Sequence, residues 1–225
     1  MTKKSKKTSQ NRTGALIIVI VLVIFGSCYL VTGADPLGLF TEIEEAAPVA
    51  VVESEGDWWH VYFTDPQPKT NSDIGSEPVN LSGSIPEKLI QHINRAEQSI
   101  HIAAFEFNLT PVAEALIAAH KRGVDVQWVT DDEHGIEADG EDGHGQFAML
   151  KKAGIEVRDD ERSALMHNKF WIFDGHTVWT GSTNMTVNGT FRNNNNVLTV
   201  AVPEVAAIYE REFTEMWDGA FGPTS

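Results

Sequence analysis

Three side chains suited to chemistry lie close together in the segment 165–184 (LMHNKFWIFDGHTVWTGSTN). His167, Lys169 and Asp174 have the spacing His-x-Lys-x-x-x-x-Asp, and a turn of small polar residues, Gly181-Ser182-Thr183-Asn184, follows them. The amides and side chains of such a turn can bind an oxyanion. An imidazole and an ammonium group beside this turn indicate chemistry on an anionic group. The alternative is a strand that carries a surface His-Lys pair beside an ordinary Asp-Gly turn.

A β-hairpin is the simplest structure that would position these groups. Residues 167–173 have the apolar and aromatic content of a strand, and Asp174-Gly175 is a typical turn pair. A second strand is expected over residues 177–180 and runs into the polar turn. Asp174 would lie at the far end of the first strand, away from the imidazole. Because side chains alternate along a strand, one face would carry His167, Lys169, Trp171 and Phe173.

The chain from about residue 57 onward alternates between predicted strands and helices. Strands are expected at 58–63, 99–107, 124–129, 155–158 and 196–202, and helices after Ser84 and Thr110 and over 146–152 and 203–217. The expected buried face of the last helix carries Val205, Ile208, Tyr209, Phe213 and Trp217. This order predicts an α/β fold with one mixed β-sheet and helices on both faces.

These motifs resemble the phospholipase D superfamily, the HKD phosphodiesterases. The resemblance rests on His167, Lys169 and Asp174, and on Gly181, Ser182 and Asn184 of the polar turn. Further similar segments are SIHIAAFEF at 99–107, an Ala-rich helix that ends in Arg-Gly-Val, and the Asn-rich run 193–196. The chain looks most similar to single-motif members, which include bacterial phospholipase D-like proteins and small endonucleases. A phospholipase D/nuclease-like catalytic domain is therefore expected over residues 57–222.

The resemblance implies that a phosphodiester is hydrolysed in two steps without a metal or another cofactor. His167 would be the nucleophile and form a phosphohistidine, while a second histidine protonates the leaving alcohol and later activates water. The resemblance assigns phosphate binding to Lys169, Ser182, Asn184 and Asn195. It counts Asp174 in the catalytic motif, where we expect a mainly structural role.

The sequence departs from the family pattern in two ways. Many relatives have Glu in the late segment where this chain has Asn195, so an acidic helper is expected to be missing. Relatives also often carry two motifs, whereas this sequence has one. The second histidine is therefore expected to be His167 of a second subunit, in a symmetric homodimer with a shared active site. His101, His134 or His144 could supply it within one chain, although none has a His-x-Lys context.

The acidic composition bears on the choice of substrate. The 225 residues have a formal net charge of −15, and the chain beyond residue 32 carries 12 basic and 32 acidic side chains. A strongly anionic domain repels polyanions at long range, which argues against tight non-specific nucleic-acid binding. Phospholipid headgroups are the favoured substrate, and an endonuclease that cleaves DNA or RNA is the alternative. A binding module without catalysis is disfavoured because His167, Lys169 and Asn184 are all present.

The N-terminal residues are typical of a membrane anchor. Residues 1–14 are basic and polar, and residues 15–31 form an uncharged apolar run long enough to span a hydrocarbon core. The basic flank places the N-terminus in the cytoplasm. We predict a single-pass signal anchor over 15–32, a flexible acidic linker over 33–56, and an extracytoplasmic catalytic domain. The alternatives are a signal peptide cleaved near 31–33 and lipoprotein processing at Cys28, the only cysteine, which excludes an intrachain disulfide.

The acidic segment 131–144 contains potential metal ligands. It fits no EF-hand spacing, so a solvated loop is favoured over a metal site. His134 and His144 belong to this segment. They could line the substrate cleft, because the segment follows a strand end in an α/β sheet.

Three of four other residues, His101, Trp58 and Trp59, have simple structural explanations, and Glu106 does not. His101 lies on a buried type of strand and is expected to be a satisfied core histidine. Glu106 needs a partner that the sequence does not identify. Trp58 and Trp59 are expected to pack in the core rather than to anchor the domain at a membrane surface.

Overall fold

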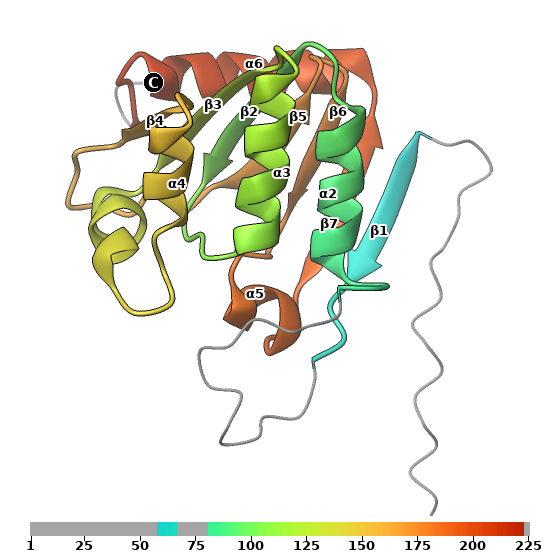
Figure 1. The fold of residues 1–225 in the computed structure, drawn as a ribbon. Coiled ribbons are helices and arrows are strands. Elements are labelled where there is room, and N and C mark those ends of the chain that lie inside the picture. Colours follow the sequence, from blue (N-terminus) through green and yellow to red (C-terminus); the bar gives the residue numbers. More distant parts are fainter. Residues whose placement is uncertain (1–57, 67–80, 223–225) are drawn as a thin grey trace, which may run out of the picture. The chain divides into compact units, whose positions relative to one another are not determined.

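The described residues form one mixed sheet of seven strands, in the order β1-β7-β6-β5-β2-β3-β4 (Figure 1). The computed structural model describes residues 58–66 and 81–222. The strands are β1 (Trp59–Phe63), β2 (Ser99–Ala104), β3 (Asp125–Thr130), β4 (Glu156–Asp159), β5 (Lys169–Phe173), β6 (Thr177–Gly181) and β7 (Asn196–Ala201). β2, β3 and β4 pair in parallel, whereas β1, β7, β6, β5 and β2 pair antiparallel. The predicted mixed sheet and the β5–β6 hairpin are confirmed.

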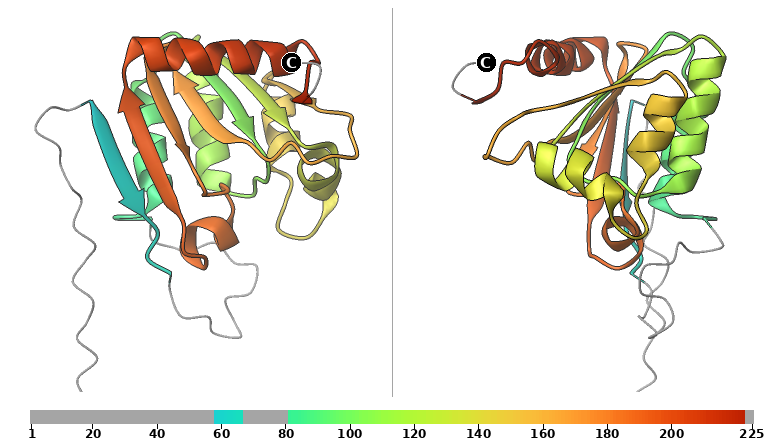
Figure 2. Two further views of the ribbon diagram at one scale, coloured as in Figure 1. Left: turned by 180° about the vertical axis from the view of Figure 1, so that it is seen from behind. Right: turned by 60° about the vertical axis from the view of Figure 1, so that its left-hand side comes forward.

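Helices cover both faces of the sheet, as predicted. α2 (Ile85–Arg95), α3 (Thr110–Lys121) and α4 (Gln146–Lys152) lie on one face, and α6 (Pro203–Trp217) crosses the strands on the other (Figure 2). The short α5 (Val187–Phe191), which the sequence analysis did not predict, lies beyond one end of the strands (Figure 1). A π-helical turn (Asp132–Glu137) and a 3-10 turn (Ala138–Gly140) follow β3.

Successive side chains of β5 point to opposite faces of the sheet, so they pack into two different layers of the core. Trp171 and Phe173 pack in the layer under α2, α3 and α4, together with Trp128 and Trp179. Phe170 and Ile172 pack in the layer under α6. Both faces of β5 are therefore buried, and the strand holds its first residue, Lys169, in a fixed direction.

The α6 helix faces the sheet with most of the expected stripe, because Phe213 is buried and Val205, Tyr209 and Trp217 pack partly buried against the same cluster. Ala206, Phe213 and Met216 are buried, and the prediction that Ile208 is buried is wrong because its side chain is 55% exposed. At about 100° per residue, a position two residues after Ala206 points away from the sheet.

Two predicted strands are longer than the observed ones. β2 ends at Ala104 rather than at residue 107, and Phe107 forms an isolated bridge with Met185. β5 begins at Lys169, so His167 precedes the strand instead of starting it. The β2–β5 pairing stops at the pair Ala104–Lys169. The residues after Ala104 and those before Lys169 therefore lie at the same end of these strands.

The expectation that Trp58 packs in the core is wrong. Trp58 precedes the edge strand β1, which pairs only with β7, and its side chain is 53% exposed. Trp59 is partly buried and contacts Trp58 edge to face, with the ring centroids 6.0 Å apart.

The predicted signal anchor and linker lie outside the described residues. Within the part of the chain that the structure describes, no helix has the length and apolar character needed to cross a membrane. The anchor over 15–32 remains a prediction.

Candidate active site

Three polar residues of the predicted motif, His167, Lys169 and Asn184, gather where β2, β5 and β6 begin or end on the same side of the sheet. Ala104, the last residue of β2, pairs with Lys169, the first residue of β5. Phe105 and Glu106 therefore leave β2 beside the segment that carries His167. Asn184 follows the end of β6 and reaches the same place through its contact with Glu106.

His167 is exposed, and its ring packs edge-on against the buried ring of Phe105, with the centroids 4.7 Å apart. The backbone just before it is fixed, because the Met166 amide donates a hydrogen bond of 2.9 Å to the buried Asp131 carboxylate. A solvent-facing imidazole is thus held on a rigid aromatic support.

Lys169 lies beside the same aromatic ring. Its ammonium group is 5.2 Å from the centre of Phe105 and donates a hydrogen bond of 3.0 Å to the carbonyl of His167. The Lys169 side chain is half-buried, and this desolvation lowers its pKa, an effect that the Glu106 carboxylate opposes. The imidazole and the ammonium group therefore share one small patch, as the spacing predicts.

The electrostatic surroundings of His167 favour its neutral form. Partial desolvation is the largest cause that lowers the pKa of His167, and the positive charge of Lys169 lowers it further. The carboxylates of Glu106 and Asp131 act in the opposite direction. A neutral imidazole keeps a free lone pair, which is the form required for nucleophilic attack.

Glu106 supplies a carboxylate that the sequence analysis could not place. The Asn184 amide group donates a hydrogen bond of 2.8 Å to Glu106, although the two residues are 78 positions apart. The Asn184 Oδ1 atom is buried without a hydrogen-bond partner among the described residues. The site thus contains a carboxylate, that of Glu106, in the segment that follows β2. Asn195 stands where many relatives have Glu.

Asn195 and Ser182 are tied to each other near this edge of the sheet. The Ser182 hydroxyl donates to Asn195 Oδ1 at 2.9 Å, and Asn195 Nδ2 donates to the carbonyl of Gly189 at 2.8 Å. At Gly181, a Cβ atom would collide with the Asn196 carbonyl, so the close approach of β6 to β7 requires glycine there. Phosphate binding by Ser182 and Asn195 remains a prediction.

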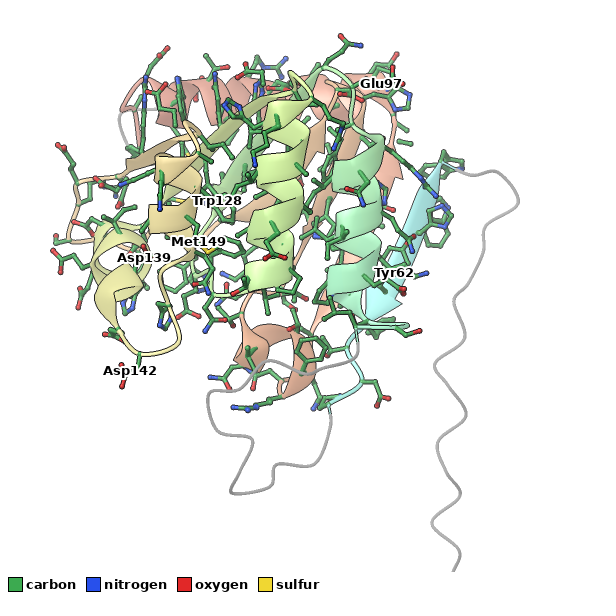
Figure 3. The ribbon with its side chains drawn as sticks, in the orientation of Figure 1. Tyr62, Glu97, Trp128, Asp139, Asp142 and Met149 are labelled. Carbon is green, nitrogen blue, oxygen red and sulfur yellow. The ribbon has the colours of Figure 1, made fainter. Side chains whose placement is uncertain are left out.

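Asp174 lies at the opposite end of β5. Its carboxylate accepts hydrogen bonds from the amides of Glu97, Gln98 and Ser99, at distances of 2.7 to 3.1 Å. Figure 3 shows Glu97 at the opposite end of the strands from Asp142, which lies in the loop before α4. The third motif residue therefore ties the hairpin turn to the start of β2 and does not face His167.

An open cavity of about 310 Å³ lies next to the site. Its described lining includes His134 and His144, as the sequence analysis anticipated, together with three carboxylates, Glu106, Glu133 and Glu141. The His134 ring also contacts Phe105, at 5.0 Å between centroids, and its charge lowers the pKa of His167.

His101, by contrast, makes its contacts with α6 and not with the residues around His167. It lies on the α6 face, where its Nδ1 atom is 2.7 Å from Glu210 and its ring stacks on Phe213. The expectation of a satisfied core histidine holds at Nδ1 alone, because the Nε2 atom of His101 is buried without a hydrogen-bond partner among the described residues. His134 is the one of the three alternative histidines that packs on the same ring, Phe105, as His167.

Comparison with protein families identifies one match over most of the described chain. The profile of the family described as "Cardiolipin synthase, PLD-like domain" matches residues 89–217. Among curated proteins, the mitochondrial cardiolipin hydrolase of Xenopus tropicalis is 34% identical over 140 residues, which are 62% of this chain and 64% of that protein. The human protein of the same name is 34% identical over 137 residues, 61% of this chain and 52% of that protein. The chain thus spans less than two thirds of these relatives.

Solved structures show the same architecture. Nuc from Salmonella typhimurium, described as a phospholipase D family member, superposes with a TM-score of 0.58 at 26% identity and covers 72% of this chain and 94% of its own. NucT from Helicobacter pylori has a TM-score of 0.52 at 22% identity, covers 59% of this chain and 87% of its own, and supports the fold alone.

Proposed function

Because the chain belongs to the phospholipase D superfamily, through a PLD-like domain that covers most of its described part, we propose that it is a metal-independent phosphodiesterase. The proposed substrates are phospholipid headgroup phosphodiesters. The observation that carries the proposal is the placement of His167 and Lys169 on the ring of Phe105, with the Glu106–Asn184 pair beside them.

The proposed reaction has two displacements at phosphorus. In the first, a ring nitrogen of neutral His167 attacks, a P–N bond forms, and the bond to the leaving alcohol breaks as a second imidazolium protonates that oxygen. In the second, water attacks the phosphohistidine, the same second imidazole accepts the water proton, and the P–N bond breaks. Lys169 and Asn184 would hold the non-bridging oxygens, whose charge they stabilise most in the transition state.

We propose that the second imidazole is His167 of another subunit, in a symmetric dimer. Leu165, two residues before His167, is 54% exposed, which leaves apolar surface on the segment that carries His167 for such a contact. His134 is the competing source within one chain because it also packs on Phe105.

Three features favour a lipid over a nucleic acid as the substrate. The curated relatives are named for hydrolysis of cardiolipin, a phospholipid. The whole chain has a net charge of −15, and the described lining of the cavity includes three carboxylates and neither lysine nor arginine. A polyanion would have to approach against this field.

The test is a parallel assay of the purified full chain on two kinds of substrate. One is vesicles of cardiolipin or of neutral phospholipids, followed by headgroup or phosphatidate release, and the other is plasmid DNA, followed on gels. We expect the wild-type chain to release headgroup or phosphatidate from the vesicles and the His167→Asn variant to release neither. Cleavage of DNA with no lipid turnover would replace this proposal with the endonuclease.

We further propose that residues 15–32 tether the domain to the cell membrane, with the catalytic domain outside the cytoplasm. The support is the sequence itself, an uncharged apolar run after a basic segment. The tethered chain should stay in the membrane fraction after alkaline extraction and be digested by protease added outside intact spheroplasts. Release of an intact, shorter protein would indicate cleavage of a signal peptide instead.

A further inference from the structure

We propose that Asp131, Asp132 and Asp160 form a binding site for a divalent cation, of the calcium type, behind the active site. One carboxylate oxygen from each residue lies within 4.8 Å of the others. Asp131 and Asp132 follow β3, and Asp160 follows the neighbouring parallel strand β4, so the sheet brings the three together.

The buried carboxylate of Asp160 has an oxygen whose hydrogen-bonding capacity is unused. Asp160 is only 4% exposed, and its Oδ1 atom accepts a hydrogen bond of 3.1 Å from the Asp132 amide. Its Oδ2 atom is buried and has no hydrogen-bond partner among the described residues. A buried carboxylate oxygen without a donor is unfavourable, and it becomes favourable with a cation or a proton.

A cation accounts for the cluster better than a proton does. Asp131 is 1% exposed, and its two oxygens accept the amides of His134 and Met166, which stabilise it as a carboxylate. One proton on Asp160 would still leave the two negative charges of Asp131 and Asp132 side by side. A divalent ion offsets two of the three carboxylate charges, more than one proton does, and each carboxylate oxygen that accepts one hydrogen bond keeps a lone pair for a metal.

The ligand chemistry favours a hard cation such as calcium. The site offers oxygen atoms alone, which hard cations prefer, whereas zinc and copper favour nitrogen or sulfur. Oxygens that all lie within 4.8 Å of one another can share one ion with bonds of about 2.4 Å, a length typical of calcium. Asp132 is half-exposed, so water can complete the coordination.

A cation here would position the nucleophile without touching the phosphate. Asp131 holds the amide of Met166, the residue before His167, and Asp160 begins the segment that leads to it. The ion would therefore join the ends of β3 and β4 to the backbone of His167. The cation site stands independently of the proposed reaction, whereas this positioning role rests on it.

The experiment measures calcium binding directly on the purified full chain. Millimolar CaCl₂ should raise Tm by about 5 °C, the shift expected for a ligand well above its Kd. Calorimetric titration with CaCl₂ alone should give one site per chain. Asp160→Asn should lose both responses, and so should Asp132→Asn, a half-exposed position that keeps the test valid if the buried variant does not fold.

Asp142→Asn is the matched control, because Asp142 is an exposed acid on the tip of the loop that follows Asp132 (Figure 3). This variant should keep the full calcium response. The proposal is overturned if the wild-type chain shows neither a shift nor a binding heat, in which case Asp160 holds a proton. It is equally overturned if Asp132→Asn responds to calcium as strongly as Asp142→Asn.

Discussion

At the scale of single residues, Phe105 organises the chemistry although it has no reactive group. Its buried ring contacts His167, Lys169 and His134, so three potentially charged groups surround one rigid apolar surface. That surface desolvates the imidazole and the ammonium group together, which lowers the pKa of both. Packing and the charge of Lys169 therefore both favour the neutral form of His167.

Replacing His167 with Asn should abolish turnover while the fold persists, because the covalent step has no substitute. The loss should be on the order of 10³-fold or more. His176→Asn is the control, since His176 is an exposed histidine in the turn of the same hairpin. Activity of folded His167→Asn protein within tenfold of wild type would remove His167 from the nucleophilic role.

The pKa of His167 should respond in opposite directions to changes in its two charged neighbours. Lys169→Met removes a cation that lowers the pKa of His167, so the pKa should rise. Glu106→Gln removes an anion that raises it, so the pKa should fall further. NMR titration of the histidine ring signals, with His167→Asn used for assignment, measures both shifts. Shifts of the same sign in the two variants would contradict this electrostatic account.

The lowered pKa of His167 also predicts how the rate depends on pH. A group whose pKa is lowered stays neutral to more acidic pH, and it loses its lone pair only as the pH falls through that lowered value. The acid limb of the rate should therefore lie below the ordinary histidine range and follow the NMR titration.

Chelation of metals should leave the chemistry intact. Lys169 and Asn184 are proposed to stabilise the phosphate charge, so excess EDTA should change the rate by less than about twofold when the assay runs well below Tm. The proposed calcium site would then contribute mainly to Tm and change the rate within this limit, because its ion supports the backbone before His167 and does not touch the phosphate. A reaction that EDTA stops and Zn²⁺ or Ca²⁺ restores would show that an ion acts on the phosphate.

The sequence predicted the residues of the motif but not all of their neighbours. The His-x-Lys spacing predicted that His167 and Lys169 lie together, and both pack on Phe105 although His167 precedes the strand. Glu106 was recognised as needing a partner, yet Asn184 lies 78 positions away, and only the folded sheet brings them together. The same limit applies to Phe105, whose contacts all come from other segments.

At the scale of elements, Asp174 shows how one motif residue can serve the hairpin rather than the reaction. Its carboxylate accepts hydrogen bonds from three consecutive amides at the start of β2, and it occupies a left-handed turn position with φ of 54°. The hairpin and β2 are thereby locked in register at the end away from His167.

Asp174→Asn should lower the free energy of unfolding and spare the reaction. Asn tolerates the left-handed conformation but loses the charge that strengthens the hydrogen bonds, a cost of about 1–3 kcal/mol. Denaturant unfolding measures this cost, and Asp142→Asn should change stability by about 0.5 kcal/mol or less. Unchanged stability with a loss of turnover like that of His167→Asn would instead give Asp174 a catalytic role.

Element boundaries were predictable where local signals are strong. The helices 146–152 and 203–217 match because glycine and proline mark their ends. The exposed Trp58 and Ile208 were misplaced because composition alone does not show which edge or helix face remains uncovered. The five-residue α5 is too short to have a hydrophobic period, so its side-chain cap at Thr186 was the only local signal.

At the scale of the whole molecule, the single motif raises a question of stoichiometry. The two-step reaction needs two imidazoles at one phosphorus, and the chain places one His-x-Lys pair at the edge of its sheet. A two-fold axis beside this edge would bring together His167 and Lys169 of both subunits. Tethering to a membrane would favour the dimer by raising the effective concentration of its subunits.

Mixed dimers distinguish a shared site from two separate ones. Differently tagged wild-type and His167→Asn subunits, co-purified as a pair, should have almost no activity, because the only phosphate site would lack either its nucleophile or its acid. Half of the wild-type rate would instead show that each subunit works alone. His134→Asn dimers provide the decisive control, since His134 is the histidine that shares Phe105 with His167. They should keep activity within about tenfold of wild type. A loss as large as that of His167→Asn, together with an active monomer by light scattering, would place the second imidazole within one chain.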